Sequence, residues 1–120
     1  MPRTRTPPST FARGRAAERR VAWHYRLRGY RILGANVRAG GVELDLVARR
    51  GRRLVVCEVK HKGGDGRGDP LEMVGPAKQE RLRRGAEAWL AAHPEASELE
   101  VRFDVVAVRG KRVERVASAF

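Results

Sequence analysis

Acidic and basic side chains that could perform phosphate chemistry are concentrated in residues 40–62. Glu43 and Asp45 are separated by one residue; Glu58 and Lys60, also separated by one, follow Asp45 after twelve intervening residues. Residues i and i+2 of a β-strand share a face, so each pair projects from one side of its strand. If the two strands form a hairpin, their carboxylates and one amine converge. No other part of the sequence offers a comparable cluster, and we treat it as the candidate active site.

The clustered carboxylates favour a divalent cation. Carboxylates held together at neutral pH repel each other, and a shared proton or a bound cation relieves this repulsion. Mg²⁺ takes one or two protein carboxylates, several waters and a phosphate oxygen, so Asp45 and Glu58 are the predicted ligands of Mg²⁺ or Mn²⁺. Lys60 could orient a metal-bound water and neutralise charge on the phosphate. Glu43 is secondary, because it could equally be a solvated or Arg-paired residue at the edge of the site.

Other reaction classes fit the sequence less well. The serines stand in no nucleophile-elbow context, and no Cys–His pairing is suggested. The glycine-rich residues 61–70 lack the Gly-Lys-Ser/Thr ending of a phosphate-cradling loop. A glycosidase could use paired carboxylates, but a basic protein favours a phosphate substrate. Phosphodiester hydrolysis is the chemistry that this cluster indicates.

The positive charge is unevenly distributed. The formal net charge is +12, and residues 1–53 carry fourteen Lys and Arg against three Asp and Glu. Such an excess indicates a polyanionic partner, of which nucleic acid is the commonest, and we expect DNA. A membrane surface or general solubility is an alternative. An Arg-rich composition that merely reflects a GC-rich genome predicts scattered charge instead of this asymmetry.

The elements that must position the cluster form one domain, residues 10–120, after a flexible basic tail, residues 1–9. Apolar periodicity predicts helices over residues 10–28 and 76–93, strands over 30–37, 42–49, 53–60, 99–109 and 112–116, and a mobile loop over 61–70. In residues 42–49, Val42, Leu44, Leu46 and Ala48 are expected on one face. Residues 53–60 are apolar on both faces, which is typical of a central strand covered by helices. The expected fold is α/β, a mixed β-sheet flanked by two helices in the order α-β-β-β-α-β-β.

Three further polar residues have two interpretations each. Glu18, the only acid of the first helix, either pairs with Arg15 or reaches the carboxylate cluster. Lys78, in the first turn of the second helix, is either solvated or a phosphate contact facing the site, and Gln79 is equally ambiguous. The aromatic residues are expected in the core or in helix packing, with no series that would stack bases: Trp23, Tyr25, Trp89 and Phe103.

The sequence also predicts a cytoplasmic protein. Cys57 is the only cysteine, so no internal disulfide exists, and the Cys/His spacing of a structural zinc site is absent. The first ten residues contain no apolar segment of a signal peptide, and nowhere do eighteen apolar residues run together.

Asp45 followed by Glu58-x-Lys60 on the next strand, behind a helix bearing Glu18, resembles the core of PD-(D/E)xK nucleases. More closely, the sequence resembles the YraN-like family of predicted bacterial endonucleases, which is similar to archaeal Holliday junction resolvases. The matching segments are GYRILGANVR (29–38), VELDLVA (42–48), LVVCEVKHK (54–62), RFDVVAV (102–108), and the residues around Lys78 and Gln79. Val42 replaces a usual glycine, and His61-Lys62 replaces a more usual arginine-bearing continuation.

This resemblance implies a restriction-endonuclease-like fold, with catalytic positions Asp45, Glu58 and Lys60 and support from Glu18. The predicted nucleic-acid contacts are Lys78, Gln79, Lys62 and Arg38. The first hypothesis is a Mg²⁺-dependent endonuclease acting on DNA, including branched or damaged DNA, with a homodimer as one way to cut two strands. The alternatives are a non-catalytic nucleic-acid-binding module and an interaction protein of a repair complex.

Overall fold

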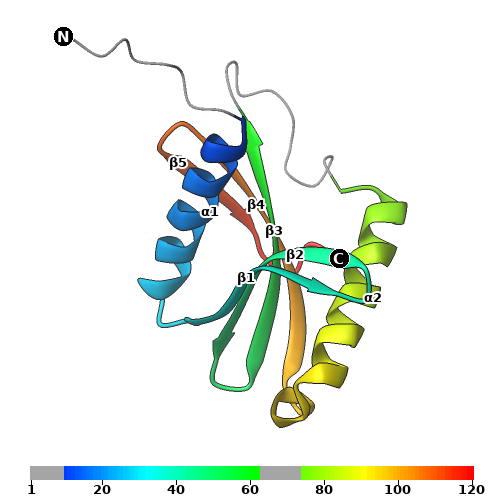
Figure 1. Cartoon of the computed structure of the whole chain (residues 1–120). Helices are drawn as coiled ribbons and strands as arrows, with labels where there is room; N and C mark the ends of the chain where they lie inside the picture. The colour runs from blue at the N-terminus through cyan, green and yellow to red at the C-terminus, as the bar shows by residue number, and fades with distance from the viewer. Residues whose placement is uncertain (1–9, 63–73) are drawn as a thin grey trace, which may run out of the picture.

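The protein is an α/β structure with one five-stranded sheet between two helices (Figure 1). The structure, a computed structural model, describes residues 10–62 and 74–120, with side chains from residue 15 onward except that of Lys62. The predicted tail and most of the predicted loop therefore lie outside the described residues. The elements follow in the order α1 (Thr10–Arg26), β1 (Arg31–Ala39), β2 (Val42–Arg50), β3 (Arg53–Lys62), α2 (Pro76–Ala92), a 3-10 turn η2 (Pro94–Ala96), β4 (Glu100–Arg109) and β5 (Arg112–Val116). The predicted fold class and element order are confirmed.

The sheet has the order β1-β2-β3-β4-β5 and is mixed. Only β3 and β4 pair in parallel, because the chain crosses from one to the other through α2, whereas the other neighbours are antiparallel. The strand β3 extends to Lys62, two residues beyond its predicted end, and pairs with β4 along its whole length. Pairing between β2 and β3 stops earlier, at Leu46 and Cys57. Beyond that pair the two strands separate, and the candidate site lies in this opening.

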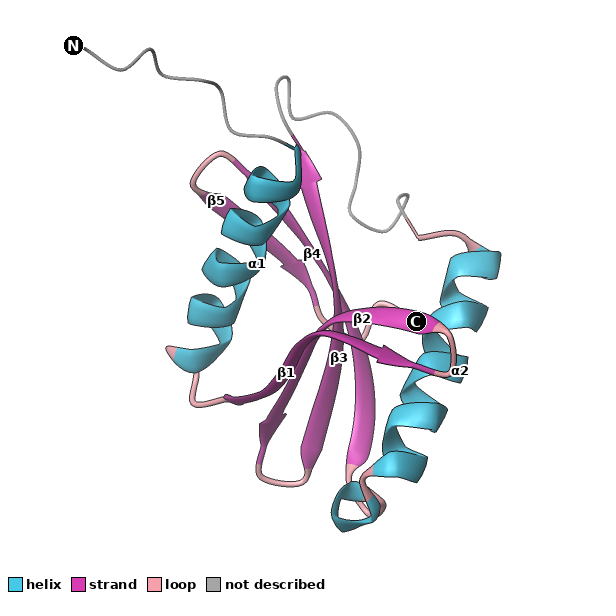
Figure 2. Cartoon of the chain, viewed as in Figure 1, coloured by secondary structure: helices cyan, strands magenta, loops and turns pink. Residues whose placement is uncertain are grey.

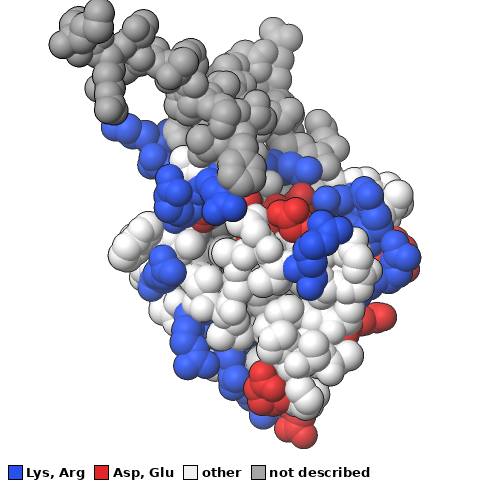
Figure 3. All heavy atoms as spheres, in the orientation of Figure 1, with Lys and Arg blue, Asp and Glu red and all other residues white. Residues whose placement is uncertain are grey.

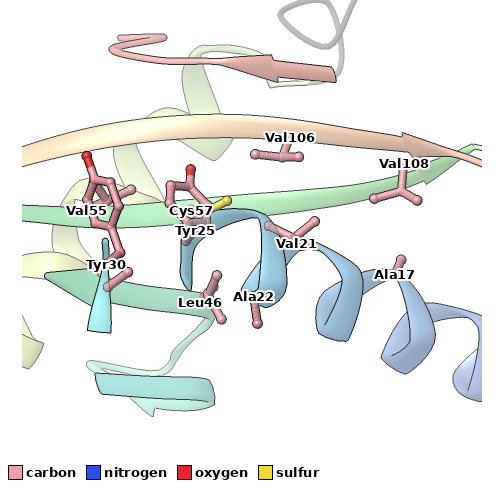
Figure 4. Packing of buried hydrophobic residues seen from close by; sticks show 11 residues of the cluster. Ala17, Val21, Ala22, Tyr25, Tyr30, Leu46, Val55, Cys57, Val106 and Val108 are labelled. Carbon is pink, nitrogen blue, oxygen red and sulfur yellow. The ribbon is translucent and has the colours of Figure 1, made fainter. Parts of the chain in front are cut away.

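Each helix covers one face of the sheet, so the fold has two hydrophobic cores (Figure 2). Val21 and Tyr25 of α1 pack on Val55 and Cys57 of β3 (Figure 4). On the other face, α2 packs against residues of all four longer strands, and the core there includes Leu82, Trp89, Leu54, Val56 and Phe103. The alternation of β3 between the two cores confirms that it is buried on both faces. Glu58 and Lys60 continue the series of Leu54 and Val56 and therefore lie on the α2 face.

The predicted alternation of β2 is wrong at Asp45. Leu44 belongs to the core under α2, whereas Leu46 and Ala48 belong to the core under α1, so residues two apart project to opposite faces. Asn36 of β1 lies opposite Asp45, between the ladder pairs on either side, and has a left-handed backbone with φ 53°. Asn tolerates this conformation better than most residues. The core to which the apolar residues of β2 belong thus changes at the residue that carries the candidate ligand, a local feature that strict period-two alternation does not contain.

The expectation that Trp23 is a packing residue is also wrong. Its side chain is 59% exposed, whereas Tyr25, Trp89 and Phe103 are buried as expected. Val21 and Tyr25 face the sheet, and Trp23 is two residues from each of them. Residues two apart lie on nearly opposite sides of a helix, so Trp23 is on the outer side of α1. The helix ends at Arg26, two residues before its predicted end, and Gly29 follows with φ +86°. The exposed ring leaves an aromatic surface beside β1.

The hairpin of β1 and β2 approaches α2 closely through two glycines. A Cβ atom on Gly40 would lie 2.9 Å from Ala88 Cβ, and one on Gly85 would lie 3.0 Å from Leu44 Cδ2. Gly40 also has φ +58°, a conformation that L side chains rarely adopt. These two positions allow the close approach of α2 to the β1–β2 hairpin.

Asp104, the most deeply buried acid among the described residues, joins α1 to β4 and to the segment after β5. It is 1% exposed and accepts hydrogen bonds from Tyr25 Oη at 2.6 Å, from Arg102 Nε and Nη2 at 2.8 and 2.9 Å, and from the Ser118 N–H at 3.1 Å. A buried carboxylate is tolerated when it is paired and its lone pairs are satisfied. Asp104 therefore has a structural explanation, and the acids near the end of β3 differ from it.

Candidate functional site

The Asp45 carboxylate occupies the opening between β2 and β3. The backbone N–H of Val59 donates to Asp45 Oδ2 at 2.9 Å, just past the last pair of the ladder, Leu46 and Cys57. A side-chain oxygen thus replaces the backbone acceptor that a continued ladder would supply. This bond fixes the carboxylate beside β3, next to Glu58.

Glu58 is a buried acid with one paired and one unpaired oxygen. Its side chain is 6% exposed, and its Oε1 lies 3.4 Å from both Lys60 Nζ and Lys78 Nζ. Its Oε2 is buried and has no hydrogen-bond partner among the residues that the structure describes. A buried carboxylate oxygen without a partner is costly, so its position calls for a donor or a cation. The two lysines leave that oxygen unused.

The carboxyl group of Asp45 has a pKa raised from 3.8 to about 7. Burial is the main cause, and the neighbouring Glu58 charge adds to it, while the hydrogen bond from Val59 opposes the shift. Glu18 and Glu43 contribute smaller repulsions in the same direction. Three other carboxylates, those of Glu58, Glu18 and Glu43, therefore interact electrostatically with Asp45, and a bound divalent cation would favour its ionised form.

Glu18 reaches this region from α1. Its Oε2 accepts a 2.6 Å hydrogen bond from Asn36 Nδ2, and its charge acts on Asp45. Of the two interpretations of Glu18, the described contacts agree with a position beside the carboxylates. Asn36 was not anticipated as part of the site. The only sequence signal for it is an Asn between apolar strand residues, a residue type suited to a left-handed backbone.

The predicted nucleic-acid contacts separate into different places. Lys78 faces the site through its ion pair with Glu58, and its side chain is 30% exposed. Gln79 instead donates to the Val74 carbonyl oxygen at 3.1 Å, where it helps to hold the start of α2. Arg38 lies on the β1–β2 hairpin, paired in the ladder with the exposed Glu43, and its Nη2 is 3.4 Å from the Gly41 carbonyl oxygen. Lys62 is the last residue of β3, and its side chain lies outside the description.

Asp45 and Glu58 are compatible with a cation that needs few protein ligands. Over residues 15–61 and 74–120, no three His, Cys, Asp or Glu side chains form a group able to hold a metal ion by themselves. Zinc would need such a set, whereas Mg²⁺ accepts one or two carboxylates and completes its shell with water and phosphate oxygens. The unpaired Glu58 Oε2 and the raised pKa of Asp45 both fit the addition of positive charge between them.

Acidic and basic side chains gather together on one face of the molecule (Figure 3). Figure 3 shows a small acidic patch in the upper part of one face, with Lys and Arg side chains on both sides of it. Alternating signs of this kind can attract a ligand that is anionic along its length. Neither helix of the described chain is both long and apolar enough to cross a membrane.

The fold and the site define a small α/β protein with a carboxylate pair and two lysines where its central strands part. The chain belongs to the family described as uncharacterised protein family UPF0102, which matches residues 17–108. It is 44% identical to a UPF0102 protein of Acidothermus cellulolyticus, over 96% of this chain and 98% of that protein. It is 45% identical to one of Frankia casuarinae, over 91% and 96%, and 38% identical to one of Bradyrhizobium diazoefficiens, over 93% and 84%. None of these three names states an activity, and the likeness to PD-(D/E)xK nucleases remains an expectation.

Proposed function

We propose that this protein is a Mg²⁺-dependent endonuclease that hydrolyses phosphodiester bonds in DNA, with Mn²⁺ as an alternative ion. The observation that carries the proposal is Glu58, a buried acid whose Oε2 has no partner in the described part of the chain, beside Asp45 and two lysines. Buried charge of this kind destabilises a fold and is typical of functional sites. The likeness to PD-(D/E)xK nucleases, in which these positions are catalytic, supports the same assignment.

Each residue has a distinct task in this proposal. Asp45 and Glu58 hold the ion, which supplies Lewis-acid polarisation of the phosphate and a more acidic water when bound. Lys60 contacts the attacking water or a phosphate oxygen and offsets the charge that grows there. Lys78, which pairs with Glu58 Oε1, would hold a neighbouring phosphate oxygen of the bound substrate. Glu18 keeps Asn36 and the turn of the β1–β2 ladder in place behind Asp45.

A non-catalytic DNA-binding protein is the second candidate. The observation that favours it is that Lys60 and Lys78 already compensate one oxygen of Glu58 without any cation. Such a protein would use the basic surface and would retain the acids only for folding. An interaction protein of a repair complex would differ from both in needing neither DNA cleavage nor tight DNA binding.

Cleavage of labelled DNA and RNA separates these functions. The panel contains single strands, duplexes, flaps and four-way junctions, each incubated with Mg²⁺, Mn²⁺ or EDTA. We expect metal-dependent cleavage of at least one DNA form, which Asp45→Ala and Glu58→Ala each abolish while salt-sensitive binding persists. Glu95→Gln, an exposed acid of η2, is the matched control and should cleave normally.

Two outcomes would reject the endonuclease. Cleavage that survives both Asp45→Ala and Glu58→Ala would show that other residues, or a contaminant, perform it. No cleavage of any form, with binding retained, would select the binding protein. Sedimentation with and without DNA tests the further expectation that two copies assemble to cut two strands.

A further inference from the structure

A hollow of about 320 Å³ lies between α1 and β1, adjacent to the candidate active site. Ala22, Ile32 and Leu46 supply apolar walls, so the hollow is not a purely charged surface. Leu46 is the last residue of β2 that pairs with β3, at the edge of the opening, and directly follows Asp45 in the chain. A hollow of this size is at the lower end of ligand sites and can hold a small planar group.

The most exposed aromatic residue of the described chain forms one side of this hollow. Trp23 is 59% exposed and also borders a second hollow on the outer face of α1, lined by Arg19 and Arg20. The Arg26 guanidinium lies over the Trp23 ring, 5.4 Å from its centroid, which restricts the orientation of the ring. The ring is therefore a partly oriented aromatic surface that no described residue buries.

Polar groups close the end of the hollow nearest the site. Glu18 and Asn36, joined by their 2.6 Å hydrogen bond, both line it, and Glu18 acts electrostatically on Asp45. The Asn36 amide and Glu18 carboxylate together offer donors and acceptors at the edge of an otherwise apolar cavity. A group that stacks on Trp23 can reach them with its own polar edge.

We propose that this hollow receives one unpaired nucleobase of the DNA, stacked on Trp23, while arginines of α1 hold the flanking phosphates. The inference rests on the proposed function, because it names the DNA structure that the same site acts on. Its physical basis is the combination of an exposed indole, apolar walls and rim cations, since a base has an apolar face and lies between two anionic phosphates. The preferred substrate would then carry an unpaired nucleotide next to the bond that is cut.

Charge distinguishes this occupant from an apolar peptide or a second copy of the chain. Arg19 and Arg26 line the rim, and an apolar partner covering the hollow would remove their charges from water without compensation. The first half of the chain is strongly basic as well, so a second copy would bring like charge to the same place. A nucleotide can stack its base on Trp23 and place its phosphates beside the arginines.

Binding measured in EDTA tests the inference without requiring cleavage. Three short duplexes of one sequence are compared by fluorescence anisotropy: fully paired, with one extra unpaired thymidine, and with an abasic residue in place of that thymidine. Wild type should bind the thymidine bulge about 5- to 100-fold more tightly than the abasic bulge. Trp23→Ala should remove this difference and leave binding to the paired duplex unchanged. Trp23→Phe should restore part of it.

Leu27→Ala is the matched control, because Leu27 is 79% exposed, follows Trp23 by one helical turn and lines neither hollow. Equal affinity of the wild type for the thymidine and abasic bulges would overturn the base-binding inference while leaving DNA binding intact. A Trp23→Ala variant that loses affinity for all three duplexes equally, or changes only its oligomeric state, would overturn it too. Failure to bind any of the three duplexes would overturn this inference, whereas the proposed function would fall only if no DNA form of the cleavage panel is cut.

Discussion

The backbone N–H of Val59 donates to Asp45 Oδ2 at 2.9 Å, at the point where β2 and β3 cease to pair. The bond holds an acid where the sheet would otherwise continue, and it leaves the other oxygen of Asp45 for further contacts. It also opposes, without cancelling, the effects of burial and of Glu58 that raise the pKa of Asp45. The sheet backbone therefore holds the Asp45 carboxyl group in place, while burial and the charge of Glu58 disfavour its ionised form.

Asp45→Asn should stabilise the protein at alkaline pH in EDTA. The folded-state pKa of about 7 exceeds the ordinary value of 3.8, so the folded protein binds more protons between these values and its free energy of unfolding falls as pH rises through this window. Each pKa unit corresponds to about 1.4 kcal/mol, and solvent screening of the partly exposed group reduces the effect. Asn keeps an acceptor for the Val59 N–H but carries no charge. In urea denaturation, the free energy of unfolding of the variant should exceed that of the wild type at about pH 8 and equal it at about pH 3. A difference that does not change with pH would contradict the titration of Asp45.

Divalent cations should raise the unfolding temperature of the wild type. Ligand that binds only the folded state stabilises it by about 2.7 kcal/mol at a hundredfold excess over the Kd. Thermal denaturation with increasing Mg²⁺ or Mn²⁺ measures this shift, and EDTA should reverse it. Glu58→Gln removes a ligand charge and should abolish the shift, whereas Glu95→Gln should retain it. An undiminished shift in Glu58→Gln would locate the cation elsewhere.

Asp104→Ala should destabilise the fold more than any change at the candidate site. It leaves Arg102 without its paired carboxylate and removes the acceptor of the Tyr25 hydroxyl, and breaking such a buried pair costs about 3–5 kcal/mol. Tyr25→Phe removes one hydrogen bond from an acid that keeps its others and should cost about 1–2 kcal/mol. Arg112→Ala, at the exposed Arg112–Glu114 ion pair, should change little. Urea denaturation of the three variants gives this order, and a small effect of Asp104→Ala would contradict the structural role of the network.

Gly40→Ala should destabilise the protein more than Gly51→Ala. Both glycines have nearly the same positive φ, +58° and +59°, but a Cβ on Gly40 meets Ala88 Cβ at 2.9 Å, whereas one on Gly51 meets nothing within 4 Å. The shared backbone strain costs about 1–2 kcal/mol, and crowding adds about 1–3 kcal/mol at Gly40 alone. Ala88→Gly should partly rescue Gly40→Ala in a double-mutant cycle measured by urea denaturation. Equal effects of the two Gly→Ala changes would show that the hairpin can move away from α2.

Local pattern determined the elements and one half of the site. Apolar residues at helical spacing predicted α1 and α2, and the two-sided apolarity of residues 53–60 predicted a central strand, because a strand buried on both faces needs apolar residues at every position. The same period of two placed Glu58 and Lys60 together at its end. These features depend only on neighbours within a few residues, which sequence spacing reports directly.

Tertiary structure alone decided the rest of the site. Asp45 lies between Leu44 and Leu46, which belong to different cores, and regular periodicity predicts no such change of face. Lys78 reaches Glu58 because Gly40 and Gly85 let α2 approach β2, a contact between segments distant in sequence. Trp23 is exposed because the sheet covers only the side of α1 that bears Val21 and Tyr25. The acids and lysine of residues 40–62 are thus set by sequence, whereas the partners that α1, β1 and α2 bring to them are set by packing.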